Sequence, residues 1–179
     1  RGLGDVYKRQ DLFSPKKKKS KGDTAASPVS KENLAIAKSW LASSDEYNLL
    51  VNGTAITAFP VYYQNDLALL RQSLRIVQAG TEVAEVKGKD LIPAHGLAMS
   101  RLLKTSVFPT EALTYEQAIA YLRKEAIVLP PSVPKGYVLV TYKEIPLGFV
   151  KNIGNRANNL YPQEWRIRSG YLPDDIRTL

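Results

Sequence analysis

Apolar residues recur at intervals of three and four in several parts of the chain, which predicts amphipathic helices there. The first helix is expected over residues 31–43, with Ser30 capping its N-terminus. The others are predicted over Asp66–Leu74, Ala94–Lys104 and Tyr115–Lys124. The last should begin with a capping box, because Thr114 is followed three residues later by Gln117.

Strand-forming residues gather in short runs between these helices. Tyr47–Val51 and Thr54–Phe59 are separated by Asn52-Gly53, which favours a two-residue hairpin turn because both residues tolerate positive φ. The other predicted strands are Tyr137–Tyr142 and Ile145–Ile153, which form a second hairpin across Lys143-Glu144, and the single runs Arg75–Gln78 and Ala126–Leu129. Helices followed by strand pairs predict an α+β fold of two small domains.

Composition places the domain boundaries. Residues 1–30 include the run KKKK among serine, proline and alanine, which indicates a basic linker that is either simply solvated or a tether for phosphates. Within it, RGLGDVYKRQ at residues 1–10 is expected to be translated adapter sequence, in which case the chain is a fragment whose missing part lies upstream. The predicted domains are 31–108 and 109–172, followed by a tail at 173–179.

The charge is distributed unevenly. The formal net charge is +8, of which the nine basic and three acidic residues of segment 1–31 supply +6. The remainder is therefore nearly neutral, and its basic residues concentrate between Lys135 and Gly170, which carry six of them against two glutamates. A modest basic patch of this kind favours an anionic partner.

The missing residue types exclude several kinds of site. The sequence has no cysteine, which excludes disulfides, thiolate metal sites and cysteine nucleophiles, and its one histidine excludes a multi-histidine metal site. We therefore expect neither a metal nor a cofactor in this chain. No apolar run approaches the roughly 20 residues that cross a bilayer, so a cytoplasmic protein without membrane contact is expected. His95 is interpreted as a structural residue first and an RNA contact second.

The stretch PLGFVKNIGNRANNLYPQEWRIRS at residues 146–169 combines amides, cations and aromatic rings. Asparagine can hydrogen-bond base edges, arginine can bind phosphate, and aromatic rings can stack on bases, so an RNA-binding loop is one interpretation. The other is a polar turn with Tyr161 and Trp165 buried in the core, and the residue types alone do not favour either. The candidate RNA contacts are Lys151, Asn152, Arg156, Asn158, Asn159, Tyr161, Arg166 and Arg168, together with Lys87 and Lys89. Arg166 and Arg168 are expected on one face of a strand.

The segment VLVTYKEIPLGFVKNIGNRANNLYPQEWRIR resembles the C-terminal PUA-like RNA-binding module of RsmF-like enzymes, a branch of the Nol/Nop/Sun family of rRNA cytosine 5-methyltransferases. The matching motifs are V-L-V-T-Y, P-L-G-F, a lysine, a glycine and N-x-Y-P. Upstream, KGKDLIPAHGLAMS and EQAIAYLRKEAI resemble the family's arrangement, in which a first C-terminal domain precedes the PUA-like one, so the resemblance covers roughly residues 33–168. It implies a PUA-like mixed β pseudo-barrel with flanking helices as the second domain. Asn158 departs from the pattern, because the family often has lysine there.

The resemblance implies a parent enzyme that methylates small-subunit rRNA with S-adenosylmethionine. That reaction needs a cysteine thiolate, which this chain lacks, so its catalytic domain and cofactor site are expected upstream of residue 1. The chain would bind and orient structured rRNA during ribosome biogenesis, with the upstream methyltransferase domain as its other partner. The alternative is a docking module that braces that domain without touching RNA. A free-standing enzyme is disfavoured, because no nucleophile and base pair is recognisable.

Overall fold

A computed structural model describes residues 29–169 of the chain. The predictions for the C-terminal tail and for all but the last two residues of the basic linker concern segments outside this range.

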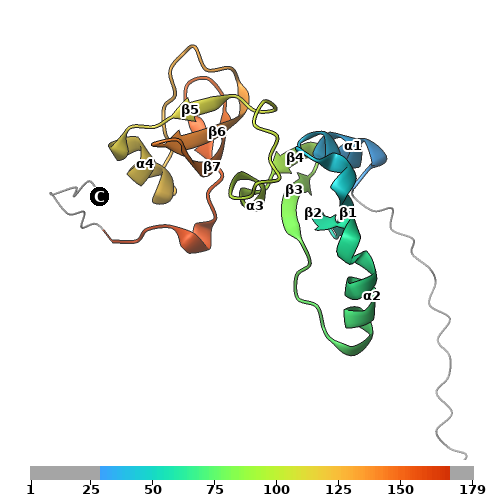
Figure 1. Ribbon diagram of the computed structural model, residues 1–179. Coiled ribbons are helices and arrows are strands. Elements are labelled where there is room, and N and C mark those ends of the chain that lie inside the picture. The colour runs from blue at the N-terminus through green and yellow to red at the C-terminus, as the bar shows by residue number, and fades with distance from the viewer. Residues whose placement is uncertain (1–28, 170–179) are drawn as a thin grey trace, which may run out of the picture.

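The first half is built on a four-stranded antiparallel sheet in the order β1-β2-β3-β4 (Figure 1). Its strands are β1 (Tyr47–Asn52), β2 (Ala55–Pro60), β3 (Thr81–Lys87) and β4 (Asp90–Pro93), preceded by α1 (Lys31–Ser39) and the 3-10 helix η1 (Ser44–Glu46). The predicted first hairpin is present, but its turn lies one residue later than expected. Asn52 pairs with Ala55, so the turn residues are Gly53 and Thr54, and Gly53 supplies the positive φ of 61°.

The second half carries a mixed four-stranded sheet in the order β5-β6-β7-β8. Its elements are β5 (Thr110–Ala112), α4 (Tyr115–Leu122), β6 (Gly136–Tyr142), β7 (Ile145–Asn152), β8 (Ala157–Asn159) and the 3-10 helix η3 (Gln163–Trp165). β5 runs parallel to β6, and the other pairs are antiparallel. The capping box at the start of α4 is confirmed. The second hairpin is confirmed too, with φ of 47° at Lys143 and 67° at Glu144 in its turn.

The α+β class is therefore confirmed: two sheets with helices between and beside their strands, and no closed barrel within residues 29–169. This arrangement agrees with a PUA-like second half. The predicted boundary at residue 108 stays a prediction, although β4 and β5 lie on either side of it.

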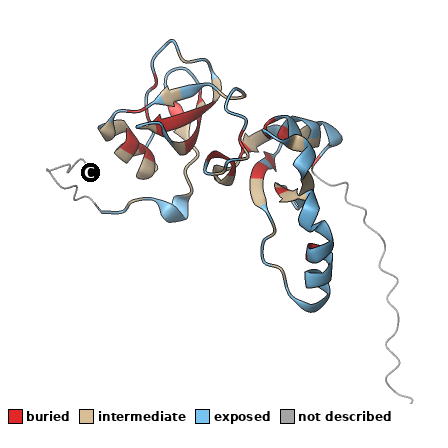
Figure 2. Cartoon of the chain, viewed as in Figure 1, coloured by how far each residue is buried: buried red, intermediate tan, exposed pale blue. Residues whose placement is uncertain are grey.

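Two hydrophobic clusters stabilise the fold (Figure 2). The first lies under the first sheet but also includes Leu139 and Phe149 of the second. An aromatic chain strengthens this junction, because Phe108 contacts Trp40 at 5.1 Å and Phe149 at 4.9 Å between ring centroids, both nearly edge-on. The second cluster lies between α4 and the second sheet, around the fully buried Tyr121.

Three predicted elements differ from the structure. The helix expected over 94–104 is only the four-residue α3 (His95–Ala98). Its apolar periodicity came from residues such as Leu97 and Leu103, which the junction buries without a continuous helix. No strand forms at Arg75–Gln78, and Ala126–Leu129 contributes only an isolated bridge from Ile127 to Ala157.

Helix α2 (Gln64–Ser73) and the 3-10 helix η2 (Val61–Tyr63) before it form an arm that projects from the first sheet (Figure 1). Leu67 is the one buried residue of α2. Several large apolar side chains of the arm and the loop after it are exposed: Tyr62, Tyr63, Leu69, Leu70, Leu74 and Val77. We call these six residues the α2 face.

Candidate nucleic-acid interface

Three lysines from the two sheets gather around one carboxylate. Lys151 of β7 donates from Nζ to Oδ2 of Asp90 at 2.7 Å. Asp90 is paired with Lys87 across the β3–β4 hairpin, and Lys89 directly precedes it. Lys87 and Lys89 are exposed, and Lys151 is half-buried. We call Lys87, Lys89 and Lys151 the lysine cluster, since the fold gathers cations that are more than 60 residues apart in the sequence.

Lys151 is the middle member of a row across the second sheet. Tyr137 of β6 and Asn158 of β8 are its direct cross-strand neighbours, and its Nζ lies 5.5 Å from the centroid of the Tyr137 ring. Its hydrogen bond to Asp90 is the main cause of a raised pKa at Lys151, so the ammonium stays charged at neutral pH. Asn158 is half-buried and makes no side-chain hydrogen bond within residues 29–169, so it remains available beside this cation.

The other two predicted asparagine contacts bond the protein's own backbone. Asn152 is buried, donates from Nδ2 to the carbonyl oxygens of Val133 and Pro134, and accepts from the Gly154 N–H at Oδ1. Its two donors are therefore occupied by the loop that leads into β6. A buried amide engaged in this way cannot read a base edge without leaving protein groups unpaired. In the structure Asn152 has a structural role, and the RNA contact expected there stays a prediction.

Asn159 follows the same pattern at the other end of the bend. Its Nδ2 donates to the carbonyl oxygens of Tyr121 at 2.7 Å and Glu125 at 2.9 Å, and its Oδ1 accepts from the Tyr161 N–H at 2.8 Å. These bonds tie the bend to α4 and to the residues just after it, where the Tyr121 carbonyl also accepts from the Lys124 N–H. Asn159 thus has a structural role as well, and its expected RNA contact also stays a prediction.

Tyr161 is held by its neighbours and is not a free stacking platform. Its ring is edge-on to His95 at 5.2 Å and to Tyr121 at 5.5 Å, and the residue is half-buried. Its carbonyl oxygen accepts a hydrogen bond from Lys124 Nζ. Tyr161 therefore joins α4, α3 and the segment after β8, and its expected RNA contact stays a prediction.

Arg156 is exposed in the turn between β7 and β8. Gly154 in the same turn has φ of 104°, and a Cβ there would lie 3.0 Å from Cε of Lys135. Lys135 and Arg156 therefore lie beside the same exposed turn, which places two cationic side chains close to it.

Arg166 and Arg168 lie in an irregular segment after η3, so the predicted strand is wrong. The segment is tied to the end of α4, because the Ile167 N–H donates to the Leu122 carbonyl at 2.9 Å. Both arginines line a shallow pocket of about 390 Å³ together with Arg123, whose Nη2 donates to the Ser169 carbonyl at 3.1 Å. We call Arg123, Arg166 and Arg168 the arginine pocket.

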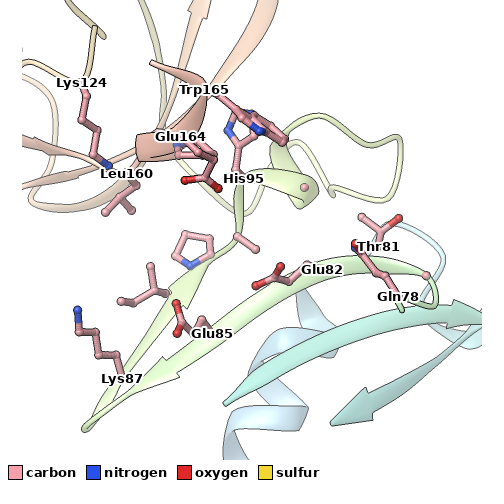
Figure 3. A pocket seen from close by; sticks show the side chains of 16 residues that line it. Gln78, Thr81, Glu82, Glu85, Lys87, His95, Lys124, Leu160, Glu164 and Trp165 are labelled. Atoms are coloured by element: carbon pink, nitrogen blue, oxygen red, sulfur yellow. The ribbon is translucent and has the colours of Figure 1, made fainter. Parts of the chain in front are cut away.

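A cavity of about 740 Å³ lies between β3–β4 and the segment 160–165 (Figure 3). Trp165 lines it with 60% of its surface exposed, so the interpretation that placed this residue in the core is wrong. Lys87 of the lysine cluster also lines the cavity, near the hairpin tip. We call this cavity the Trp165 cleft. Sequence reasoning missed it because its walls come from two sheets.

His95 anchors the cleft wall. Its ring lies 5.2 Å from the Trp165 ring and nearly perpendicular to it. Behind it, Gly148 has φ of 141°, and a Cβ there would lie 2.2 Å from the Tyr121 hydroxyl and 2.9 Å from His95 Nδ1. Burial lowers the pKa of His95, and its Nδ1 is buried with no hydrogen-bond partner among the described residues. The histidine is therefore a neutral, tightly packed support, as the structural interpretation expected.

The charges inside the cleft are mixed. Glu82, Glu85 and Glu164 line it beside Lys87 and Lys124. Burial, and then the nearby Glu85, raise the pKa of Glu82. The cleft thus offers carboxylate oxygens as acceptors next to an exposed indole, while the lysine cluster lies at one end.

Other kinds of site find no support in this part of the chain. Residues 29–169 contain no group of three or more histidine, aspartate or glutamate side chains that could hold a metal ion. Within the same range, every helix is too short or too polar to cross a bilayer.

The sequence model of the family described as "Methyltransferase RsmF PUA domain" matches residues 108–167. That range contains β5 to β8, α4, η3 and the first residues of the arginine pocket.

Two bacterial proteins called ribosomal RNA small subunit methyltransferase F are similar to more of the chain. The one from Enterobacter sp. (strain 638) is 29% identical over 138 residues, which are 77% of this chain and 27% of the relative. The one from Shigella boydii serotype 4 (strain Sb227) is 26% identical over 160 residues, 89% of this chain and 30% of the relative. The chain thus spans less than a third of the length of these relatives. Residues 108–167 therefore match the sequence model of the RsmF methyltransferase PUA domain, and this match agrees with the resemblance drawn from the sequence.

Proposed function

We propose that this chain is the RNA-recognising portion of an S-adenosylmethionine-dependent rRNA (cytosine-5) methyltransferase that acts on the small ribosomal subunit. The observation that carries the proposal is the lysine cluster, which the PUA domain and the first sheet build together at their junction. The relatives' names support the assignment to small-subunit rRNA. Such a protein works in the cytoplasm, where ribosomal subunits are assembled.

The chain contributes binding and orientation to this reaction. Lys87, Lys89 and Lys151 neutralise phosphates of folded RNA, and Asn158 offers an amide to a ribose or base beside them. The arginine pocket and Arg156 provide further phosphate contacts at the other end of the PUA domain. Holding the RNA in a fixed orientation raises the local concentration of the target base near the catalytic groups.

The residues of this chain do not fit S-adenosylmethionine chemistry themselves. Methyl transfer to cytosine C5 in the resembled family depends on a cysteine, and the sequence contains none. We therefore assign the cofactor and the covalent step to a methyltransferase domain elsewhere in the parent protein, and derive no step of that reaction from this chain.

Salt-dependent RNA binding tests the proposal. Affinity for a structured small-subunit rRNA fragment is measured against salt for the wild type and for Lys87→Ala/Lys89→Ala/Lys151→Ala. Losing three phosphate contacts should lower the slope of log K against log salt by about 2 to 3. The matched control changes three exposed lysines outside the cluster, Lys31, Lys38 and Lys104, to alanine. Equal slopes in the two triple variants would contradict the role of the cluster.

The α2 face supports a second candidate function, docking of the parent's methyltransferase domain. Tyr62 is 85% exposed and Val77 is 92% exposed, and the arm projects from the first sheet (Figure 1). Large contiguous apolar surfaces mark sites that a partner covers. We propose the methyltransferase domain as that partner because more than two thirds of each relative lies outside the matched region.

Copurification without RNA tests the docking. The chain is coexpressed with the rest of its parent protein, treated with ribonuclease and pulled down. Leu70→Glu/Leu74→Glu should abolish copurification, because both side chains are exposed on the arm. Gln72→Glu adds a charge to the same helix outside the α2 face and should leave copurification intact. Retention of the partner by the double variant would reject this candidate.

A further inference from the structure

The Trp165 cleft has the shape of a ligand site and is placed beside a cationic surface. Its volume of about 740 Å³ falls within the roughly 300–1,000 Å³ of small-molecule pockets. Ile92, Pro93 and Leu160 give it an apolar lining, while Glu82 and Glu85 project from β3 on one side (Figure 3). Lys87 connects it to the lysine cluster.

Trp165 is the feature of the cleft that needs an explanation. An indole that is 60% exposed gains little from folding, yet this one is held in place by the perpendicular His95 ring and by η3. His95 is itself fixed against Gly148, so the support is rigid. A rigid, accessible indole at the rim of a cavity is a surface on which a flat ring can stack.

The charges of the cleft exclude a phosphate as its occupant. Three carboxylates line it against two ammonium groups, and Lys124 already donates to the Tyr161 carbonyl. Carboxylates repel phosphate but accept hydrogen bonds from amino and ring N–H groups, as glutamate does from the amino group of cytosine. A base fits this lining, with its phosphate outside on the lysine cluster.

We propose that the Trp165 cleft binds a single unpaired RNA base, which stacks on Trp165 and donates its exocyclic amino group to Glu82 or Glu85. This inference rests on the proposed RNA-binding function and specifies the kind of RNA element: a base turned out of a loop or bulge. Cytosine, adenine and guanine carry the required amino group and uracil does not. Phosphate contacts at Lys87 fix the backbone at the mouth of the cleft.

Intrinsic fluorescence provides a direct test, because the chain has two tryptophans and Trp40 is only 7% exposed. Short oligocytidylate titrated into the full chain should quench the fluorescence of the exposed Trp165, and oligouridylate should do so at higher concentration. Trp165→Leu should remove the quenching and weaken binding by about 5- to 150-fold, the effect of losing one stacked base. Trp165→Phe should retain most of the affinity.

Two controls separate stacking from other causes. Tyr62→Leu removes an exposed ring outside the cleft and should not change the affinity. Glu82→Gln/Glu85→Gln should narrow the preference for oligocytidylate over oligouridylate without weakening the binding of oligouridylate. In a structured RNA with one looped-out nucleotide, an abasic site at that position should lower the affinity of the wild type as much as Trp165→Leu does. This comparison tests the proposal even if the Trp165→Leu variant does not fold.

The outcomes distinguish this inference from the proposed function. Wild-type RNA binding with no quenching, and with the same affinity in Trp165→Leu, would overturn the base-binding cleft and leave the RNA-binding function standing. Quenching by oligouridylate and oligocytidylate at equal concentration would overturn the assignment of the glutamates. No RNA binding by the wild type at low salt would overturn the proposed function itself.

Discussion

The bend between Asn152 and Asn159 joins two strands of the second sheet, whereas the Trp165 cleft lies between β3–β4 and residues 160–165, and the two regions use their polar groups in opposite ways. In the bend, the side-chain amides of the two end asparagines donate hydrogen bonds to carbonyl oxygens of the protein's own backbone. In the cleft, an indole and several carboxylates face an open cavity. The bend has the amino-acid composition of an RNA-binding loop, whereas the cleft has the open cavity that a ligand site needs. The two regions therefore differ in whether their polar groups are free to bind a ligand, more than in the chemical type of those groups.

Gly148→Ala should have the largest effect on this comparison, because the glycine supports the cleft from behind. The new Cβ would collide with the Tyr121 hydroxyl and His95 Nδ1, at a φ of 141° that L residues rarely adopt. Overpacking and backbone strain together should lower the free energy of unfolding by about 4 kcal/mol. Urea denaturation measures the loss. A variant of unchanged stability would mean that His95 is not fixed against β7.

Asn159→Ala should have the next largest effect. It should lower the free energy of unfolding and leave specific contacts with RNA unchanged. It leaves the Glu125 carbonyl and the Tyr161 N–H without the partner that Asn159 supplies and removes one of the donors to the Tyr121 carbonyl, which should cost about 3 kcal/mol. Asn158→Ala is the matched control, since this neighbour makes no side-chain hydrogen bond in the described chain. If Asn159→Ala kept full stability but bound RNA weakly, the bend would be an RNA contact after all.

His95 should make stability depend on pH below its ordinary pKa of about 6.5. Burial lowers its pKa in the folded state, so below pH 6.5 the unfolded chain binds the proton more readily and stability falls. The fall ends once the pH is below the folded pKa, and above pH 6.5 this contribution is constant. Glu82, whose pKa is raised, acts with the opposite sign at lower pH.

The measurement is the difference in unfolding free energy between the wild type and His95→Phe across pH 5 to 8. The difference should vary with pH only below about 6.5. Because the chain has a single histidine, its proton resonance reports the folded titration without overlap. A midpoint at or above 6.5 would show that the ring is hydrated and that the cleft wall is looser than the structure has it.

Asn158→Lys should have the smallest effect. It tests whether RNA passes over the surface beside Lys151. The new cation would lie directly opposite Lys151 and extend the lysine cluster toward the bend. One added phosphate contact should steepen the salt slope by about 0.7 to 0.9. An unchanged slope, measured in the same titration as the wild type, would place the RNA path away from β8.

The sequence predicts the fold best where local chemistry decides it. The turn at Lys143-Glu144, the capping box at Thr114 and the α+β class follow from neighbouring residues. The strands β4, β5 and β8 are missed because three or four residues are too few to show alternation. The overlong helix after Ala94 arises because burial at a junction produces the same apolar spacing as a helix face.

The candidate site is predicted less completely, for a different physical reason. Long cationic side chains usually reach solvent, and Lys151, Arg156, Arg166 and Arg168 keep their proposed role because none of them is buried. Asparagines and aromatics serve a core as well as they serve RNA, and only packing decides between the two. Asn159 and Tyr161 therefore became structural, while Trp165 became accessible.

Leu139 and Phe149 belong to the PUA sheet by sequence but are buried in the cluster beneath the other sheet. Excising residues 108–167 as a module would expose both side chains to water and leave an apolar surface on each fragment. In the intact molecule this shared packing opposes independent rotation of the two sheets, because neither sheet can turn without disturbing the cluster that both contribute to.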